Sequence, residues 1–215
     1  MTFMKTKPSL IFDIDGTLWD STEKVAEAFN SGIRDDPRLA AYYPLTAGRL
    51  SREFGLPLSD IGHNLFPSLS RSESDALIEH LCDLEEAWLT KDPAEPYEGV
   101  RETVRALAAV YDLYIVSNCQ AGYAEVFLNG TGLWESFRDH LCPGDTGLFK
   151  ADNIALMMAK YDIREAWYIG DTEGDRLAAR EAGAHFIHAS YGFGRVSEAD
   201  AVIDKFSDLL RLFPV

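Results

Sequence analysis

Short hydrophobic runs alternate with longer amphipathic stretches along the chain, and this alternation predicts strands separated by helices. Four runs are rich in β-branched or aromatic residues and lead into polar residues and glycine. They lie at residues 10–12, 113–116, 166–169 and 185–187. Because strands that alternate with helices form parallel sheets, we expect an α/β fold with a doubly wound, Rossmann-like, mostly parallel sheet. Functional residues are then expected where the strands end.

The first two runs are separated by about a hundred residues, far more than one crossover helix requires. Apolar residues at helical spacing indicate helices around residues 25–33 and 77–88, and Ser72 with Asp75 predicts a capping box before the second helix. The segment 92–96 contains two prolines and ends this insert, because proline cannot continue a helix. We predict a core domain with an inserted small α-helical cap domain, the core formed by residues 1–19 and 93–215 and the cap by residues 20–92.

The composition is that of an ordinary folded protein. Of the 215 residues, 47% are hydrophobic and 26% are charged, which excludes wholesale disorder. The net charge of −15 disfavours nucleic acid and membrane surfaces as partners, since both attract basic patches. The three cysteines form no CxxC motif and favour neither a zinc site nor a disulfide framework, which indicates a reducing compartment. Without an apolar stretch of signal-peptide or membrane-span length, we expect a cytoplasmic protein, with a monomer favoured.

Two pairs of acidic residues follow predicted strands. Asp13 and Asp15 project to the same side because residues i and i+2 of an extended chain share a face, and Asp171 and Asp175 share a face at the start of a helix. Alone, the first pair also fits acidic residues that decorate a strand end. If the strand ends meet, four carboxylates converge, and two like charges 4 Å apart repel by about 4 kcal/mol at an effective dielectric constant of 20. Such a cluster requires a cation, and an all-oxygen ligand set favours Mg²⁺.

Three further polar residues lie near these strand ends. Lys150 precedes a predicted helix, where its ammonium group is placed either to bind a phosphoryl oxygen or to be solvated. Ser117 and Asn118 follow the second strand, where they can donate hydrogen bonds to phosphate or cap the next helix. A metal beside such groups would explain how an acidic protein accepts a small phosphorylated metabolite.

The segments DIDGTLWDS, IVSN, Lys150 and GDTEGD resemble, in order and spacing, the four motifs of the haloacid dehalogenase (HAD) superfamily. The insert directly after the first motif resembles the helical-cap phosphatase branch of that superfamily, which includes the phosphoglycolate phosphatases. The similarity covers essentially the whole chain. One departure is Ala151, which follows the lysine where many relatives have proline.

The resemblance implies a role for each motif residue. Asp13 would be the nucleophile and Asp15 the general acid/base, while Ser117 and Lys150, with Asn118 next to them, would contact phosphate. The implied Mg²⁺ site consists of Asp13, the backbone carbonyl of Asp15, Asp171 and a supporting Asp175. The implied reaction is a two-step phosphoryl transfer through an aspartyl-phosphate.

Three alternatives differ in what they require of these residues. A carbon–halogen hydrolase would leave Asp15 without a role, because a departing halide needs no proton. A phosphomutase of the β-phosphoglucomutase type would use the same core residues and pass the phosphoryl group to a sugar. A non-catalytic phosphate-binding module, from a different functional class, would bind phosphate without turnover.

Substrate selection is expected to lie in the cap. Arg49 and Arg52 are three residues apart, where a guanidinium group could bind a second anionic group of the substrate or lie on a solvated helix face. Trp19 and Asp20 lead into the cap and could line the entrance, although Trp19 could equally pack at a hinge. The segment 190–194 is expected to form either a loop at the active edge or a purely structural turn.

Overall fold

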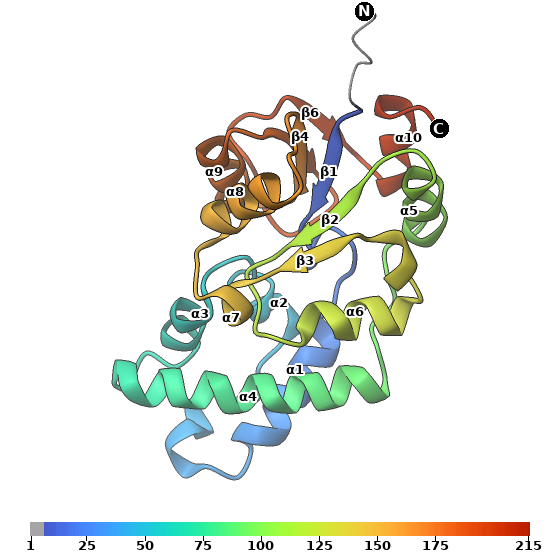
Figure 1. Ribbon diagram of the computed structural model, residues 1–215. Coiled ribbons are helices and arrows are strands. Elements are labelled where there is room, and N and C mark those ends of the chain that lie inside the picture. The colour runs from blue at the N-terminus through green and yellow to red at the C-terminus, as the bar shows by residue number, and fades with distance from the viewer. Residues whose placement is uncertain (1–6) are drawn as a thin grey trace, which may run out of the picture.

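The computed structural model describes residues 7–215, and a six-stranded sheet lies at its centre (Figure 1). Every neighbouring pair of strands is parallel, in the order β3-β2-β1-β4-β5-β6. The strands are β1 (Ser9–Phe12), β2 (Leu113–Val116), β3 (Asp139–Leu141), β4 (Ala166–Gly170), β5 (His185–Ala189) and β6 (Ala201–Ile203). The order runs outward from β1 in both directions, so the doubly wound α/β prediction is confirmed. The first six residues of the predicted core domain lie outside the described residues.

Two edge strands were not predicted by the hydrophobic pattern. The four expected runs form β1, β2, β4 and β5, whereas β3 and β6 lie at the two edges of the sheet. Each of these two strands has only three residues, and all three residues of β3 are half-buried. Because an edge strand is less covered than a central one, its sequence carries no continuous apolar run to mark it.

Helices cover both faces of the sheet. They are α1 (Thr22–Ile33), η1 (Pro37–Tyr42), α2 (Ala47–Leu50), α3 (Leu58–Leu65), α4 (Arg71–Lys91), α5 (Val100–Ala108), α6 (Tyr123–Thr131), η2 (Trp134–Ser136), α7 (Pro143–Thr146), α8 (Lys150–Lys160), α9 (Glu173–Ala182), η3 (Phe206–Asp208) and α10 (Leu209–Leu212). Since successive strand residues point to opposite faces, Ile11 packs with residues of α8 and α9, while Leu10 and Phe12 pack with residues of α5 and α10. None of the described helices is both long and apolar enough to span a bilayer.

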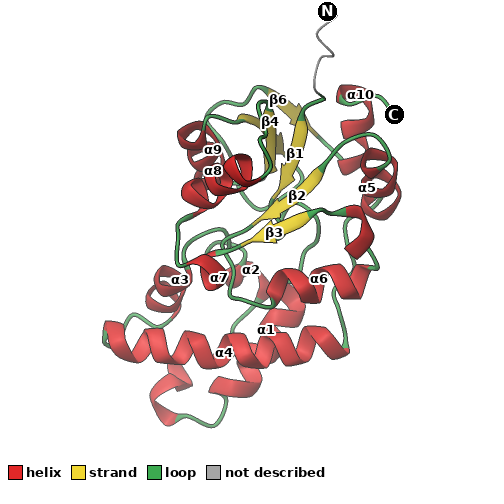
Figure 2. Cartoon of the chain, in the orientation of Figure 1, coloured by secondary structure: helices red, strands yellow, loops and turns green. Residues whose placement is uncertain are grey.

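Between β1 and β2 the described chain forms helices and loops without a strand of the sheet (Figure 2). We call the part from α1 to α4, residues 22–91, the helical insert. Helix α4 packs against α1 and α3 within the insert and against α6 of the core. The predicted capping box is wrong by two residues, because Ser70 and Glu73 form it. The longer glutamate side chain of Glu73, unlike Asp75, reaches back to the N-cap amide. That the insert forms a separate cap domain stays a prediction.

Candidate active site

Residues from three distant segments meet at the carboxyl ends of β1 and β4. Asp13 directly follows β1, and its backbone N–H donates to the carbonyl of Ile169 on β4. Lys150 begins α8, and its Nζ donates to Asp13 Oδ1 at 3.0 Å and to Asp175 Oδ1 at 2.6 Å. All three charged side chains are buried. The structure therefore brings Lys150 to the two carboxylates near which the sequence analysis expects it.

Burial and charge oppose each other at this cluster. Burial raises the pKa of Asp13 to about 6, although Lys150 and a hydrogen bond from Ser117 lower it. Burial lowers the pKa of Lys150, but Asp13 and Asp175 outweigh burial and raise that pKa above its usual value. Asp13 is thus a carboxylate at neutral pH with an ammonium group beside it, which is the state that a nucleophile requires.

Asp171 follows β4 and has one oxygen without a partner. Its Oδ2 accepts hydrogen bonds from the backbone N–H groups of Phe193 at 2.7 Å and Gly194 at 3.3 Å. Its Oδ1 is buried and accepts no hydrogen bond from the described residues. Burial, with the charges of Asp175 and Asp13, raises the pKa of Asp171 to about 8. A buried carboxylate oxygen without a donor is the position at which a cation would be favourable.

The residues at this position fit a divalent metal. Asp13, Asp171 and Asp175 each offer a carboxylate oxygen, and the three atoms lie within 4.8 Å of one another. When all are ionised, these three carboxylates and the Lys150 ammonium leave two uncompensated negative charges. Oxygen ligands without histidine or cysteine are typical of Mg²⁺. Gly16 keeps the space beside Asp171 free, because a Cβ at this left-handed position would lie 2.3 Å from Asp171 Oδ2.

Asp175 supports this cluster through four hydrogen bonds. Its Oδ1 accepts from Lys150, and its Oδ2 accepts from the backbone N–H groups of Asp171 and Thr172 and from the Thr172 hydroxyl. Thr172 is the N-cap of α9, so the Asp175 carboxylate also closes the capping box of that helix. The arrangement fits the supporting position that the sequence analysis gives to Asp175.

The carboxylate of Asp15 does not join the other three, so the expected convergence of four carboxylates is wrong. Asp15 Oδ1 accepts hydrogen bonds from Trp19 Nε1 at 3.0 Å, from Ser21 Oγ at 2.7 Å and from the Tyr123 hydroxyl at 2.7 Å. Gly16, with φ of 78°, turns the chain sharply after Asp15, and these three donors hold the side chain where it is. Burial raises the pKa of Asp15 to about 7, against the hydrogen bonds, which lower it. Of the groups of Asp15, only the backbone carbonyl is left as a ligand for the predicted metal site.

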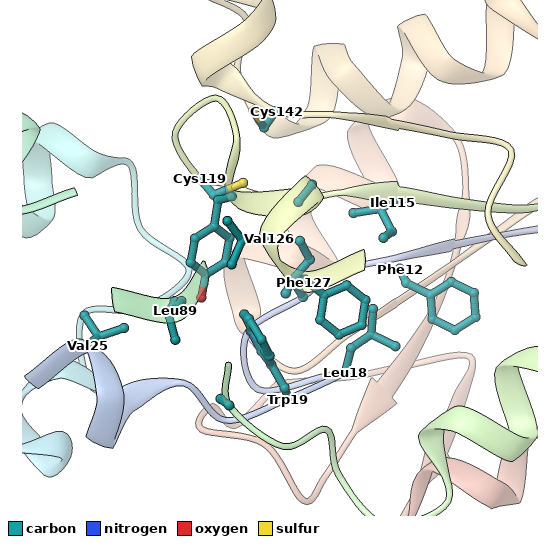
Figure 3. Packing of buried hydrophobic residues seen from close by; sticks show 14 of the residues in the cluster. Phe12, Leu18, Trp19, Val25, Leu89, Ile115, Cys119, Val126, Phe127 and Cys142 are labelled. Atoms are coloured by element: carbon teal, nitrogen blue, oxygen red, sulfur yellow. The ribbon is translucent and has the colours of Figure 1, made fainter. Parts of the chain in front are cut away.

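Trp19 lies in the interior and does not line an entrance, which leaves the packing role that was the alternative for it. Trp19 is fully buried and packs edge-on against Phe127, with ring centroids 5.1 Å apart (Figure 3). Since its indole N–H binds Asp15, Trp19 positions that carboxyl group. Asp20 is exposed, and its Oδ1 accepts hydrogen bonds from the N–H and hydroxyl of Thr22 at the start of α1.

The two arginines predicted to select the substrate form no ion pair with the buried carboxylates among the described residues. Arg49 forms an ion pair with Glu53 and donates to the carbonyl of Asn64 at 2.6 Å, so its guanidinium group is engaged within the helical insert. Arg52 is exposed and makes no ion pair with a described residue. An arginine four residues before a glutamate favours this local pairing over a contact with the core.

The helical insert covers the carboxylates at one contact with the core. Asn118 Nδ2 donates to the carbonyl of Gly55 at 2.9 Å, and Phe54 packs edge-on against Phe193, with ring centroids 6.0 Å apart. Phe193 belongs to the segment 190–194, which therefore lies at the active edge as expected. Ser117 is buried beside Asp13. Asp13 itself is 2% exposed.

A small cavity remains between insert and core beside Asp15, and we call it the inner cavity. Its volume is about 30 Å³, and its lining includes Asp15 and Tyr123 from the core and Phe54 and Glu85 from the insert. The pattern of the sequence gives no functional role to Ser21, Tyr123 or Glu85. The residues around Tyr123 do not indicate that its hydroxyl reaches Asp15, because this contact joins two segments that are distant in the sequence.

Comparisons with known proteins agree on one family. The model of a family described as haloacid dehalogenase-like hydrolases matches residues 10–189. A phosphoglycolate phosphatase of Photobacterium profundum is 31% identical, over 94% of this chain and 93% of that protein. One from Agrobacterium fabrum is 29% identical, over 97% of this chain and 93% of the relative. A solved haloacid dehalogenase-like hydrolase of Streptococcus pneumoniae has a TM-score of 0.79 at 21% identity, and the match covers 96% of this chain and 98% of that one.

Proposed function

Because the chain belongs to the haloacid dehalogenase-like hydrolases and is a phosphatase, we propose that it hydrolyses a small phosphomonoester with Mg²⁺ through an aspartyl-phosphate on Asp13. The observation that carries the proposal is the pairing of the buried Asp13 carboxylate with the ammonium group of Lys150 at 3.0 Å. A carboxylate next to a fixed cation can attack phosphorus while the cation stabilises charge on the phosphoryl oxygens.

In the first step, an oxygen of Asp13 attacks the phosphorus atom and the bond to the ester oxygen breaks. Asp15 gives its proton to the departing alkoxide, so the alcohol leaves neutral. In the second step, Asp15 takes a proton from water, and the resulting hydroxide attacks the phosphorus of the aspartyl-phosphate. Inorganic phosphate is released and the carboxylate of Asp13 is regenerated. The pKa of Asp15, raised by burial to about 7, supports both directions of proton transfer near neutral pH.

The other residues bind and orient the substrate. Lys150 and Ser117 lie beside Asp13 and are placed to contact the phosphoryl oxygens. Asp13, Asp171 and the backbone carbonyl of Asp15 would hold Mg²⁺, with Asp175 supporting them, and the unpartnered Asp171 Oδ1 supports this assignment. When bound, Mg²⁺ supplies positive charge that offsets the negative charge of the phosphoryl group.

The test is phosphate release from a set of esters under controlled metal content. We expect p-nitrophenyl phosphate to be hydrolysed with Mg²⁺, EDTA to stop the reaction and added Mg²⁺ to restore it. A phosphosugar in the set separates hydrolysis from the phosphomutase alternative, because a mutase returns an isomeric phosphosugar in place of phosphate. Turnover that is unaffected by EDTA would contradict the metal requirement.

A further inference from the structure

Glu85 is a buried carboxyl group that the proposed reaction does not use. It lies on α4 of the helical insert, is 5% exposed and lines the inner cavity together with Asp15. Gln120 Nε2 donates to its Oε2 at 3.1 Å, and the weakly donating thiol of Cys82 lies near it. A carboxylate has about four acceptor positions, so Glu85 retains capacity for a donor that enters the cavity.

The inner cavity borders Asp15, the side chain beside which the alcohol half of a substrate begins in the proposed function. In the proposed function, Asp15 protonates the departing alkoxide, so the ester oxygen must come within hydrogen-bonding distance of Asp15. The atoms attached to that oxygen then extend into the space that Asp15 and Glu85 share. None of the described residues that line this cavity is a lysine, arginine or histidine, and its two charged side chains are both carboxylates.

The spaces that adjoin the inner cavity also lack a cation. One groove, of about 530 Å³, shares Leu58, Ile78, Cys82 and Gln120 with the inner cavity. Its lining includes four carboxylates and no basic residue, the acids being Asp75, Glu79, Asp83 and Glu86. A second space, of about 240 Å³, meets the inner cavity at Asn118 and has an uncharged lining. Both spaces around the leaving-group position are therefore acidic or neutral.

This arrangement disfavours a carboxylate on the leaving group. The alcohol released from phosphoglycolate, the substrate in the names of the relatives, carries a carboxylate, and here it would enter a cavity that already holds two acidic groups and no cation. An ammonium group would instead form an ion pair with Glu85, whose side chain is buried. Burial raises the pKa of Glu85 to about 8, which shows how unfavourable its negative charge is without a partner.

We propose that the substrate is a phosphate monoester of a small amino alcohol, and that Glu85 binds its protonated amine while Asp15 protonates its ester oxygen. This inference rests on the proposed function, because that function places the leaving group beside Asp15. It assigns selection of the leaving group to Glu85, a residue of the insert, in place of the expected Arg49 and Arg52.

The test compares three esters of equal length that differ in one group. O-phosphoethanolamine and 2-hydroxyethyl phosphate carry an ammonium and a hydroxyl group on the second carbon from the ester oxygen, and in 2-phosphoglycolate that second carbon is the carboxylate carbon. With Mg²⁺ present, kcat/KM is expected to fall in that order, with about a tenfold or larger difference between the first and the last. The ratio of kcat/KM for O-phosphoethanolamine to kcat/KM for 2-phosphoglycolate measures the preference for the amine.

Glu85→Gln tests the residue directly, since glutamine keeps the shape and removes the charge. The amine preference is expected to fall about tenfold in this variant. Glu135→Gln makes the same change at an exposed glutamate on η2, outside all three spaces, and is expected to keep the ratio of the unmodified protein. If Glu85→Gln does not fold by circular dichroism, the order of the three esters in the unmodified protein decides alone.

The outcomes separate this inference from the function on which it rests. Hydrolysis of p-nitrophenyl phosphate together with equal or better use of 2-phosphoglycolate overturns the inference and leaves the proposed function standing. Failure to hydrolyse any of the four esters overturns both. An unchanged amine preference in a folded Glu85→Gln variant overturns the assignment to Glu85.

Discussion

Tyr123 and Asp15 are 108 residues apart in the sequence, yet the Tyr123 hydroxyl donates a hydrogen bond of 2.7 Å to Asp15 Oδ1. Ser21 and Trp19 donate to the same oxygen. Burial raises the pKa of Asp15 to about 7, and the three donors oppose this rise because they stabilise the charged form. Because these effects on its pKa oppose each other, the Asp15 carboxyl group can give or take a proton near neutral pH.

Removing one of these donors is expected to shift the pH dependence of the reaction. In Tyr123→Phe the charged form of Asp15 loses a hydrogen bond, so its pKa rises. The protonated form of Asp15 gives the proton to the alkoxide, so kcat/KM falls as pH rises through this pKa. The falling limb of kcat/KM for an alkyl phosphate should therefore move to higher pH, by about 0.5–1 unit. Tyr111→Phe, which removes a hydroxyl bonded to Pro214 far along the chain, is the control, and equal profiles in both variants would argue against this role of Tyr123.

Replacement of Asp15 itself should distinguish between good and poor leaving groups. An alkoxide needs a proton to leave, whereas p-nitrophenolate leaves readily without one. In Asp15→Asn, formation of the aspartyl-phosphate from an alkyl phosphate should slow by about 10²–10⁴-fold, and formation from p-nitrophenyl phosphate far less. The first turnover, measured by rapid mixing, isolates this step from the later attack of water. The same loss for both esters would show that Asp15 is not the acid.

Asp13→Asn should abolish turnover of every ester, because the amide is a much weaker nucleophile than the carboxylate. We expect kcat to fall by at least about 10³-fold. Lys150 keeps its ion pair with Asp175 in this variant, so the fold should be retained, which the unfolding temperature checks. Asp162→Asn, at an exposed position outside the site, is the matched control and should keep full activity. Retention of more than about a tenth of the activity in Asp13→Asn would rule out this residue as the nucleophile.

The meeting of Asp13 with Asp171 could be predicted from the sequence because strand ends impose it. Asp13 and Asp171 each follow a buried strand, and parallel strands that are neighbours in the sheet end at the same edge. The direction of the Asp15 side chain was not predictable in this way. It depends on Tyr123 and Ser21, which approach from other segments, and the i, i+2 rule holds only while the chain remains extended. Gly16 ends that extension directly after Asp15.

Glu85 could not be identified from the sequence because the spacing of apolar residues in α4 does not show clearly which side of the helix is buried. The expected apolar stripe included Leu84 and Trp88, but Trp88 is 39% exposed, whereas Leu89 is fully buried. Helix α4 contacts α1, α3 and α6, so more than one narrow stripe of it is covered. Glu85 lies between Leu81 and Leu89 at a spacing of four residues, and all three are buried. A charged residue inside an apolar stripe is the signal that could have identified it, once the correct stripe was known.

Metal binding at the carboxylate cluster should be visible as thermal stabilisation without any substrate. A ligand at about 100 times its dissociation constant stabilises the native state by about 2.7 kcal/mol. For a chain of this length, that corresponds to a rise in Tm of about 5–10 °C on addition of Mg²⁺. Asp171→Asn removes the charge at the unpartnered oxygen and should lose most of the rise, whereas Asp162→Asn should keep it. A rise of equal size in Asp171→Asn would place Mg²⁺ elsewhere.

Glu85 should make the protein less stable as pH rises through neutrality. Its pKa is about 8 in the native state, where burial disfavours the charge, against an ordinary value of 4.5. Between these two values the native state binds more protons than the unfolded state, so the free energy of unfolding falls as pH rises. The contribution of Glu85 to the free energy of unfolding changes by on the order of 5 kcal/mol across the whole window.

In Glu85→Gln this contribution is absent, because glutamine does not titrate. The difference in unfolding free energy between the variant and the unmodified protein should therefore move in favour of the variant from acidic to alkaline pH. Urea denaturation below, within and above the window, with EDTA present, measures this difference, and the other titrating groups of the site cancel in it. Glu135→Gln, at its exposed position, should follow the unmodified protein throughout. If the free energy of unfolding depends on pH in the same way in Glu85→Gln and in the unmodified protein, Glu85 is solvated in solution. A buried charge on Glu85 could then not be the reason for selecting an amine.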